Sequence, residues 1–342
     1  MPDQREQRPT LKTIAEITGL SQSTVSLSLR DGNKLKQSTR DKVARAAEQI
    51  GYVPNRAGVR LRTGRTNVLA LVLAADVNNL DFTRILIQGI GERIKDSRYH
   101  LSVVPEFERS DPVAAVEYIL KNRSADGVVL THTSARDPRV QMLMDADFPF
   151  VSHGRTEFYS AHAYHDFNAE KFMALSVNRL VAKGRQHILL AAVDNGTTNF
   201  ANTANGFKLA IARTGITGEV AEHSDVLSNT KGARQFGEAL ADRDQPCDAI
   251  ICNNELTALA IIGGLQGKGI QLGTDYDLIC KQTTEILPTL YPQMDTVSED
   301  LFVTGRELAD LLLARIDGHD VGGLQTLHEP ITHWRDTITT QR

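Results

Sequence analysis

The sequence has few cysteines, no long apolar segment and no strong excess of either charge. Its 342 residues include three cysteines, Cys247, Cys252 and Cys280, whose spacing matches no metal-binding motif. We therefore expect no disulfide framework and a reducing, cytoplasmic setting. The longest apolar run, Val68–Ala75, has eight residues, whereas a membrane-spanning helix needs about 20. The first ten residues, MPDQREQRPT, have no apolar core, so we expect no secretory signal.

The formal net charge of −4 conceals an uneven distribution. Residues 1–65 contain 13 Lys and Arg against 6 Asp and Glu, a net charge of +7, which leaves −11 for the remainder. A small basic end on a large acidic body is typical of a polyanion-binding module joined to a second domain. A solvated basic face is the alternative interpretation of the same charge.

The basic end has the pattern of two helices joined by a tight turn. Thr10 is a suitable N-cap for the first helix, and Gly19 ends it as a left-handed C-cap. Ser21 caps a second helix, in which we expect Val25 and Leu29 to face the core. Two helices joined by a short turn that contains glycine form a helix-turn-helix.

A third helix is expected to start at Ser38 as its N-cap and to end at Gly51. Its buried side is expected to comprise Val43, Ala46, Ala47 and Ile50. Lysines and arginines on this helix and its flanks would contact phosphates, and such contacts weaken as salt rises.

The second helix is expected to enter the major groove of DNA, because the N-terminal residues of a recognition helix meet base edges. Gln22 can form two hydrogen bonds with adenine. Ser21, Ser23 and Thr24 are short enough to bond phosphates or bases at close approach. Leu27 fits two roles, contact with a thymine methyl or packing against the core.

Two segments of this end, TLKTIAEITGLSQSTVSLSL and TRDKVARAAEQIGYVPNRAGVRLRTGRT, resemble the N-terminus of the LacI/GalR family of bacterial transcription regulators. The likeness rests on the pattern A-x-x-x-G-[LV]-S-x-x-T-V-S, which begins at Ala15, and on GYVPN at 51–55. It continues more weakly along the rest of the chain. The resemblance implies an all-α helix-turn-helix domain, followed by an α/β core that resembles periplasmic binding proteins and has two Rossmann-like subdomains.

The resemblance also implies a hinge helix over about 55–61 that folds on DNA, with Leu61 wedged into the minor groove. A core contact at the domain junction is the alternative for Leu61. Gly58 and Val59 replace the family's Ala and Arg, and Gly costs about 1 kcal/mol relative to Ala within a helix. We therefore expect this hinge to depend more on DNA for its folding. The expected DNA contacts are Thr10, Ser21, Gln22, Ser23, Thr24, Ser26, Leu27, Tyr52, Asn55, Arg56 and Leu61.

From residue 66 onward, buried-strand patterns alternate with amphipathic helices. Strands are expected at 68–75, 101–104, 127–130, 149–153, 187–193, 249–252 and 278–280. Helices are expected at 82–95, 113–122, 169–183, 202–214, 231–242 and 256–267. This alternation predicts parallel sheets with right-handed crossovers, which bind ligands at the carboxyl ends of their strands.

The resemblance implies that the chain crosses between the two subdomains three times, near 162–166, 295–298 and 324–328. We expect a DNA-binding domain over 1–54, a hinge and linker over 55–65, and a ligand-binding and dimerisation core over 66–342. Within the core, the N-subdomain is expected to comprise about 66–163 and 297–324. The C-subdomain is expected to comprise about 164–296 and 325–342.

A small-molecule effector is expected in the cleft between the subdomains, by the same resemblance. The candidate contacts are Phe82, Arg155, Thr203, Asn253 and Gln282. Thr203 and Gln282 replace the Arg and Asp with which many members grip sugar oxygens, and Lys281 replaces an aromatic residue. Amides still bond hydroxyls, whereas Lys281 or Arg155 would meet a carboxylate or phosphate. The expected effector is a sugar, a sugar phosphate or a sugar acid.

Other chemistry finds little support. Gly267-Lys268 is followed by glycine rather than Ser or Thr, so it is not a phosphate-binding loop. His162-x-x-His165 is a weak metal-binding pair, and a role in a loop or interface suits it better. The cysteines are expected to be small buried hydrophobes, with a redox sensor as the alternative. We expect no cofactor, no metal and no enzymatic activity.

The sequence therefore predicts a cytoplasmic, homodimeric repressor of carbohydrate genes that binds a pseudopalindromic operator and responds to an effector. The dimer is expected to use the helices over 82–95 and 256–267. The last 18 residues have no heptad pattern for a tetramer. An activator or dual regulator of the same architecture stays open, as does a sugar-processing enzyme with a DNA-binding arm. The basic end argues against a plain solute-binding protein.

Overall fold

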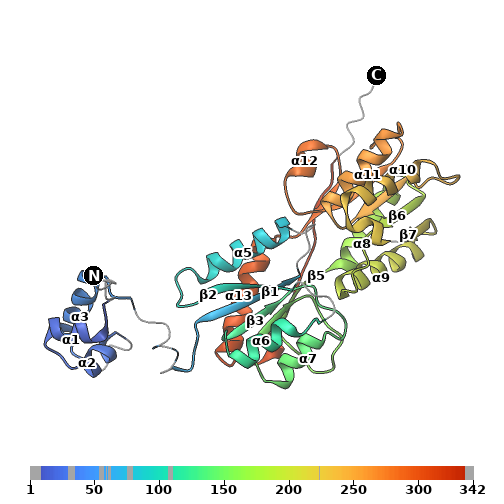
Figure 1. The fold of residues 1–342 in the computed structure, drawn as a ribbon. Coiled ribbons are helices and arrows are strands. Elements are labelled where there is room, and N and C mark those ends of the chain that lie inside the picture. Colours follow the sequence, from blue (N-terminus) through green and yellow to red (C-terminus); the bar gives the residue numbers. More distant parts are fainter. Residues whose placement is uncertain are drawn as a thin grey trace, which may run out of the picture. The chain divides into compact units, whose positions relative to one another are not determined.

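The structure is a computed structural model that describes residues 9–29, 35–53, 58, 60, 63–74, 80–106, 111–222 and 224–335. The chain divides into two compact units, Met1–Thr66 and Asn67–Arg342 (Figure 1). No helix in these described ranges is long and apolar enough to span a membrane.

The helices described in the first unit are α1 (Leu11–Thr18), α2 (Gln22–Ser28) and α3 (Gln37–Gln49). The Thr10 hydroxyl caps α1 by accepting a hydrogen bond from the backbone N–H of Thr13 at 3.3 Å. Gly19 ends α1 in the left-handed region, with φ of 67°. The Ser21 hydroxyl caps α2 and accepts from the N–H of Thr24 at 3.2 Å. The two predicted N-caps and the glycine C-cap are confirmed.

Two predicted details of this unit are wrong. Lys36 is the N-cap of α3 and makes no side-chain capping bond, so Ser38 is not the cap. Gln37 already belongs to the helix, where its amide donates to Asp41 Oδ1 at 2.7 Å. Leu29 is 38% exposed because α2 ends before it and its own backbone forms the C-cap. The core of the unit contains Ile14, Val25, Val43, Ala46 and Ala47.

The second unit contains two six-stranded sheets, each in one lobe. The first sheet has the order β11-β5-β4-β3-β1-β2. Its strands are β1 (Val68–Ala74), β2 (His100–Glu106), β3 (Gly127–Leu130), β4 (Phe150–His153), β5 (Tyr164–Phe167) and β11 (Gln325–His328). The second sheet has the order β12-β10-β9-β8-β6-β7. Its strands are β6 (His187–Ala191), β7 (Thr217–Val220), β8 (Ala249–Cys252), β9 (Asp277–Gln282), β10 (Thr296–Ser298) and β12 (Ile331–His333).

Neighbouring strands run parallel in both sheets, except that β12 pairs antiparallel with β10. The predicted parallel α/β architecture is therefore confirmed, and β3 and β8 have the predicted bounds. The first lobe carries α5 (Leu80–Ile94), α6 (Ala114–Asn122), α7 (Pro138–Asp145) and α13 (Leu301–Ile316). The second lobe carries α8 (Ala169–Ala182), α9 (Thr198–Ala212), α10 (Thr230–Ala241), α11 (Glu255–Gly267) and the short α12 (Ile286–Leu290).

Helices cover both faces of each sheet because successive strand residues point to opposite sides. On β1, Leu69 and Leu71 pack in the cluster that contains α5 and α13, while Ala70 and Val72 pack with α6 and α7. In the second lobe, α10 and α11 cover one face and α8 and α9 cover the other. Both faces are apolar, as buried parallel sheets require.

The helices α5 and α13 cross at a pair of glycines. A Cβ atom on Gly89 would lie 2.2 Å from the carbonyl oxygen of Phe302, and one on Gly305 would lie 3.1 Å from Gly89 Cα. The second lobe repeats this arrangement where Gly237 and Gly264 lie between α10 and α11. In each lobe, the two helices that cross at these glycines, α5 with α13 and α10 with α11, are therefore packed with their backbones in contact.

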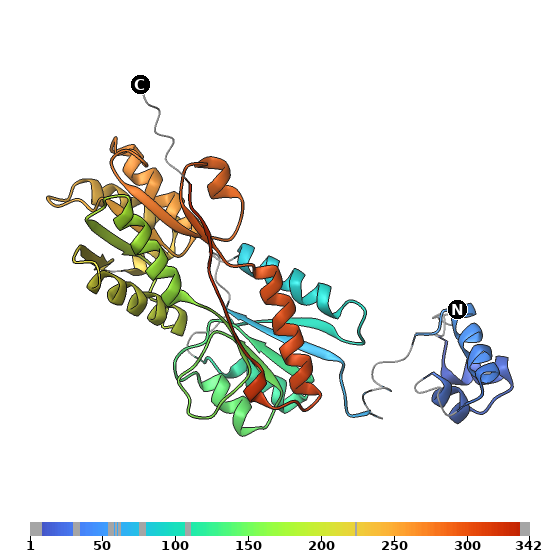
Figure 2. The same cartoon turned by 180° about the vertical axis from the view of Figure 1, so that it is seen from behind.

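The chain passes between the lobes three times: after β5, after β10 and after β11. Figure 2 shows the C-terminal strands, in red, running from one lobe to the other. Each segment predicted to cross between the lobes overlaps the strand that ends just before an observed crossing, namely β5, β10 or β11. Because β5 and β11 pair within the first sheet, the first lobe extends a few residues beyond the expected limits at 163 and 324.

Candidate effector cavity and DNA-reading helix

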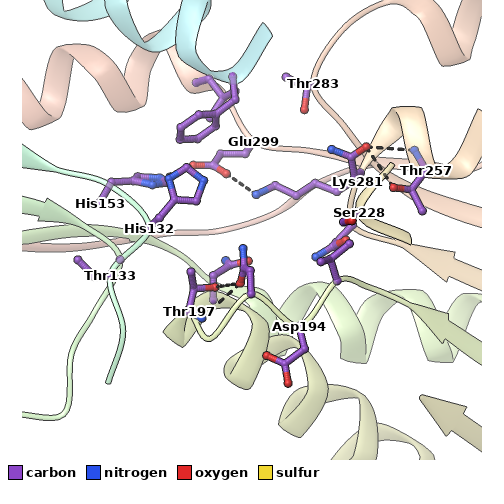
Figure 3. Close-up of a pocket in the computed structure, with 18 of the residues that line it drawn as sticks. His132, Thr133, His153, Asp194, Thr197, Ser228, Thr257, Lys281, Thr283 and Glu299 are labelled. Carbon is purple, nitrogen blue, oxygen red and sulfur yellow. Dashed lines mark hydrogen bonds and ion pairs between the residues drawn. The ribbon is translucent and has the colours of Figure 1, made fainter. Parts of the chain in front are cut away.

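A cavity of about 410 Å³ lies where the two lobes meet (Figure 3). Its size is within the range usual for small-molecule sites. Many of its lining residues end or follow parallel strands, as His153 does for β4, Asn253 for β8 and Gln282 for β9. The cavity is therefore at the carboxyl ends of the strands, where α/β sheets bind ligands.

The first lobe contributes aromatic and imidazole rings to this cavity. Phe82, on the first turn of α5, lies with its ring centroid 5.7 Å from that of His132 and 5.4 Å from that of His153. Gly154, with φ of 113°, lies so close to Thr133 that a Cβ atom would be 2.5 Å from its hydroxyl oxygen. This wall presents an apolar face with nitrogen atoms at its edge, which suits stacking against a ring.

The second lobe contributes a wall of amides and hydroxyls. These residues are Asn195, Thr197, Asn199, Ser228, Asn253, Asn254, Thr257, Gln282 and Thr283. Some also hold the wall itself in place: Asn254 caps α11 by accepting from the N–H of Thr257 at 3.1 Å. Gln282 Oε1 accepts from the hydroxyl of Thr296 at 2.7 Å, and its Nε2 donates to Glu285 at 3.3 Å.

A buried ion pair joins the two walls. Lys281 Nζ lies 2.6 Å from Glu299 Oε2, and His153 Nε2 lies 3.3 Å from Glu299 Oε1 (Figure 3). Burial alone would raise the pKa of the Glu299 carboxyl, whose side chain is 1% exposed, but Lys281 and His153 hold that pKa well below its usual range. Lys281 also lies 4.0 Å from the ring centroid of Phe167. Its charge is therefore already matched within the protein.

Three of the five predicted effector residues, Phe82, Asn253 and Gln282, line the cavity. Arg155 and Thr203 do not. The Arg155 guanidinium pairs with Asp166 at 2.6 Å and with Glu170 at 3.0 Å; Asp166 lines the cavity, but Arg155 does not. Thr203 is buried within α9, where its hydroxyl donates to the carbonyl oxygen of Asn199 at 2.8 Å.

Sequence reasoning missed several lining residues. His132, His153 and Asp194 follow or end strands β3, β4 and β6, so the rule that ligands sit at the carboxyl ends of strands could have found them. Glu299 gave no such signal, because it follows β10, a three-residue strand too short to show a pattern.

The start of α2, the expected recognition helix, is exposed. Ser21, Gln22 and Ser23 are exposed, and the Ser21 hydroxyl lies 2.8 Å from those of both Ser23 and Thr24. Leu27 is partly buried outside the core cluster, whereas Tyr52 packs against that cluster. Of the other candidates, Thr10 is exposed and Ser26 is partly buried. The predicted contacts Asn55, Arg56 and Leu61 lie outside the described residues.

Comparisons with known proteins match both units. Residues 10–55 match the model of the bacterial regulatory proteins of the lacI family, and residues 177–338 match the periplasmic binding protein-like domain. The HTH-type transcriptional regulator AglR of Rhizobium meliloti is 28% identical over 90% of this chain and 87% of its own length. CelR of Thermobifida fusca is 27% identical over 92% of this chain and 94% of its own.

Solved structures show the same fold. The lac repressor dimer bound to operator has a TM-score of 0.82 at 20% identity, with 97% of this chain and 99% of that chain covered. The complex of the regulator CelR with cellobiose has a TM-score of 0.69 at 24% identity, with 96% of this chain and 99% of that chain covered. Residues 10–55 are therefore a DNA-binding helix-turn-helix domain of the lacI family, and the chain is similar over most of its length to HTH-type transcriptional regulators.

Proposed function

We propose that this regulator represses carbohydrate uptake or catabolism genes and leaves its operator when a neutral sugar fills the cavity between its lobes. The observation that carries the proposal is the cavity itself, with stacking rings on one wall and amides and hydroxyls on the other. Hydroxyl-rich ligands need such donors and acceptors, and a pocket fixes a ligand by a few polar groups among apolar ones.

A neutral sugar suits the cavity better than a sugar phosphate or a sugar acid. Of the two cations expected to hold an anion, Lys281 is paired with Glu299, and Arg155 is paired with Asp166 and Glu170 and does not line the cavity. Asp194 adds a further carboxylate to the lining, whereas the lining carboxylate of Asp166 is matched by Arg155. An anionic effector would therefore face acidic groups and would have to displace Glu299 from Lys281, at a cost in desolvation and pairing.

The DNA contacts proposed are those of the exposed start of α2, with Ser21, Gln22, Ser23 and Thr24 at base edges or phosphates. Thr10, Ser26, Leu27, Tyr52, Asn55, Arg56 and Leu61 complete the proposed set. The relative solved with operator is a dimer, which supports a homodimer on a pseudopalindromic site. Such a protein acts in the cytoplasm, where the DNA lies, and needs no catalytic activity.

Coupling between the sites follows from population shift. If a sugar binds one arrangement of the lobes more tightly than the other, it shifts the dimer toward that arrangement. Operator binding then changes by the same factor as sugar binding. The relatives include the ribose operon repressor of Lactococcus lactis and a CelR structure with cellobiose, which supports a carbohydrate effector.

The test is a thermal-shift screen of the full chain against neutral mono- and disaccharides, sugar acids and sugar phosphates. Binding to the folded state raises the apparent Tm, and the rise grows with the ratio of ligand concentration to Kd. We expect a neutral sugar to stabilise the chain and to release it from duplex DNA selected by the chain from a random pool. If only anions stabilise it, the neutral effector is wrong; if a stabilising sugar strengthens DNA binding, the sign of control is wrong.

The DNA contacts are tested on the same selected duplex. Gln22→Ala should weaken binding by about 5- to 150-fold, because one bidentate base contact contributes about 1–3 kcal/mol of discrimination. Gln141→Ala, which removes a glutamine on α7 that bonds Asp145, is the matched control and should leave DNA affinity unchanged. Equal loss in both variants, or in neither, would remove Gln22 from the proposed contacts.

A further inference from the structure

Outside the effector cavity, a second polar cluster lies beside the three crossings between the lobes. We propose that His165, Glu307 and His328, the crossover cluster, form a binding site for a divalent transition metal ion such as Zn²⁺. Their ligand atoms all lie within 4.8 Å of one another. None of the three lines the effector cavity.

The distances suit one ion. His165 Nδ1 lies 3.1 Å from Glu307 Oε2, and His328 Nε2 lies 3.0 Å from Glu307 Oε1. Ligand atoms held about 2.0–2.1 Å from a tetrahedral metal are about 3.3 Å apart. Small side-chain rotations therefore suffice for all three atoms to reach one centre. Two histidines and a glutamate form a known zinc ligand set, with water at the fourth position.

The burial pattern provides both rigidity and access. The His165 side chain is fully buried, whereas those of Glu307 and His328 are 34% and 29% exposed. An ion can thus enter from the solvent side, and a water molecule can complete its coordination. Imidazole and carboxylate together suit zinc and related first-row metals better than Mg²⁺ or Ca²⁺, which prefer oxygen ligands alone.

The surroundings of His165 supply the outer hydrogen bonds that metal-bound histidines need. His165 Nε2 lies 3.1 Å from the hydroxyl of Thr304, which in turn donates to Glu299 at 3.3 Å. With the imidazole proton on Nε2, His165 donates to the Thr304 hydroxyl, which donates in turn to Glu299. The lone pair of His165 Nδ1 then faces the Glu307 carboxylate. A cation between these two acceptors satisfies both, and such relays orient metal-bound histidines. The Thr326 hydroxyl lies 3.0 Å from the same Nδ1.

The position of the cluster gives the ion a structural consequence. His165 is on β5, just before the first crossing, and His328 ends β11, just before the third. Glu307 is on α13, the helix that follows the second crossing. One bound ion would therefore tie together the three segments through which the lobes are connected.

The test is calorimetric titration of the full chain with ZnCl₂, after the protein has been stripped of metal with EDTA and freed of the chelator. We expect one site per chain. Glu307→Gln and His328→Ala should each weaken the affinity at least tenfold, because each removes a ligand. The matched control is His187→Ala, which removes the histidine of a His–Glu pair that lies 3.6 Å from Glu219 and should leave the affinity unchanged.

Two further measurements distinguish an ion bound by the crossover cluster from ions bound by separate histidines on the surface. Co²⁺ in place of Zn²⁺ should give the visible absorption of a four-coordinate ion, and this signal should disappear in His328→Ala. Zn²⁺ should raise the Tm of the wild-type chain but not that of Glu307→Gln. Absence of binding to the wild-type chain, or equal affinity in wild type and both ligand variants, would overturn the proposal.

Discussion

The two walls of the effector cavity use different chemistry, although the two lobes share one fold. The first-lobe wall contains Phe82, His132 and His153, whereas the second-lobe wall consists mainly of amides and hydroxyls. Both lobes have a six-stranded sheet between two helix layers and a glycine pair at a helix crossing. The difference therefore arises in the loops and helix starts that follow the strands, which is where an α/β fold tolerates change.

This contrast suggests a division of labour. A wall of rings supplies contact area with few directional demands, while a wall of amides reads the positions of hydroxyl groups. The Lys281–Glu299 pair joins the two walls and fixes the charge between them. Substitutions at the joint and in the second-lobe wall test this interpretation, and one at a buried first-lobe histidine outside the cavity tests the response of that lobe to pH.

The largest expected effect is at the joint. Lys281→Met should lower the free energy of unfolding by about 3 kcal/mol, because it leaves the Glu299 carboxylate buried with only part of its compensation. Lys281 is 19% exposed and His153 retains its contact with Glu299, so we expect the low end of the usual range. Urea unfolding at pH 7 measures the loss.

The control for this prediction is Lys268→Met, which breaks an exposed pair with Asp242 at 2.7 Å. It should cost much less stability than Lys281→Met, because water screens an exposed pair. Equal stability of Lys281→Met and wild type would show that the two walls are not held by this charge pair.

The next effect concerns the second-lobe wall. The ligand for this test is the neutral sugar that gives the largest thermal shift. Gln282→Ala should weaken its binding at least tenfold, because the sugar hydroxyls would lose the hydrogen bonds that the buried Gln282 amide makes with them. Gln186→Ala, on an exposed loop of the same lobe, is the matched control. Calorimetric titration with that sugar checks the result, and undiminished affinity in Gln282→Ala would show that the amide wall does not read the ligand.

The parallel α/β core was predictable because its strands are apolar and end in turn signals. The runs over 68–75, 127–130 and 249–252 became β1, β3 and β8 with little change. By contrast, β5 has the sequence YHDF and carries buried His165 and Asp166. Such a strand shows no apolar pattern, because its polar groups are matched by partners on α13, β11 and the loop after β4.

The helix α13 was not predicted, although Leu301, Leu308 and Leu312 lie at helical spacing and are buried. Its Gly305 is required where α13 crosses α5, as Gly89 is on the predicted α5. The effector site was predictable only in part. Asn253 follows a recognisable strand and Gln282 ends one. By contrast, Arg155 pairs with Asp166 and Glu170, which belong to no motif that would have identified them as its partners. Pairing of charges is decided by tertiary packing, which local patterns do not encode.

The smallest effect concerns pH and the first lobe. His162 is 4% exposed, and its ring accepts from the Thr156 hydroxyl at 2.8 Å and donates to the carbonyl oxygen of Ala163 at 2.9 Å when neutral. Burial lowers its pKa from the usual 6.5, although the bond to Ala163 opposes the shift. Its contribution to stability is therefore complete above pH 6.5 and is lost as pH falls below that value toward the lower folded-state pKa.

His162→Gln should accordingly flatten the decline in stability between pH 6.5 and 5, by at most about 1.4 kcal/mol per pH unit. Urea unfolding in the presence of EDTA, at steps across this range, measures the slope. An unchanged slope in His162→Gln would show that this buried imidazole of the first lobe does not contribute to the acid sensitivity of the fold.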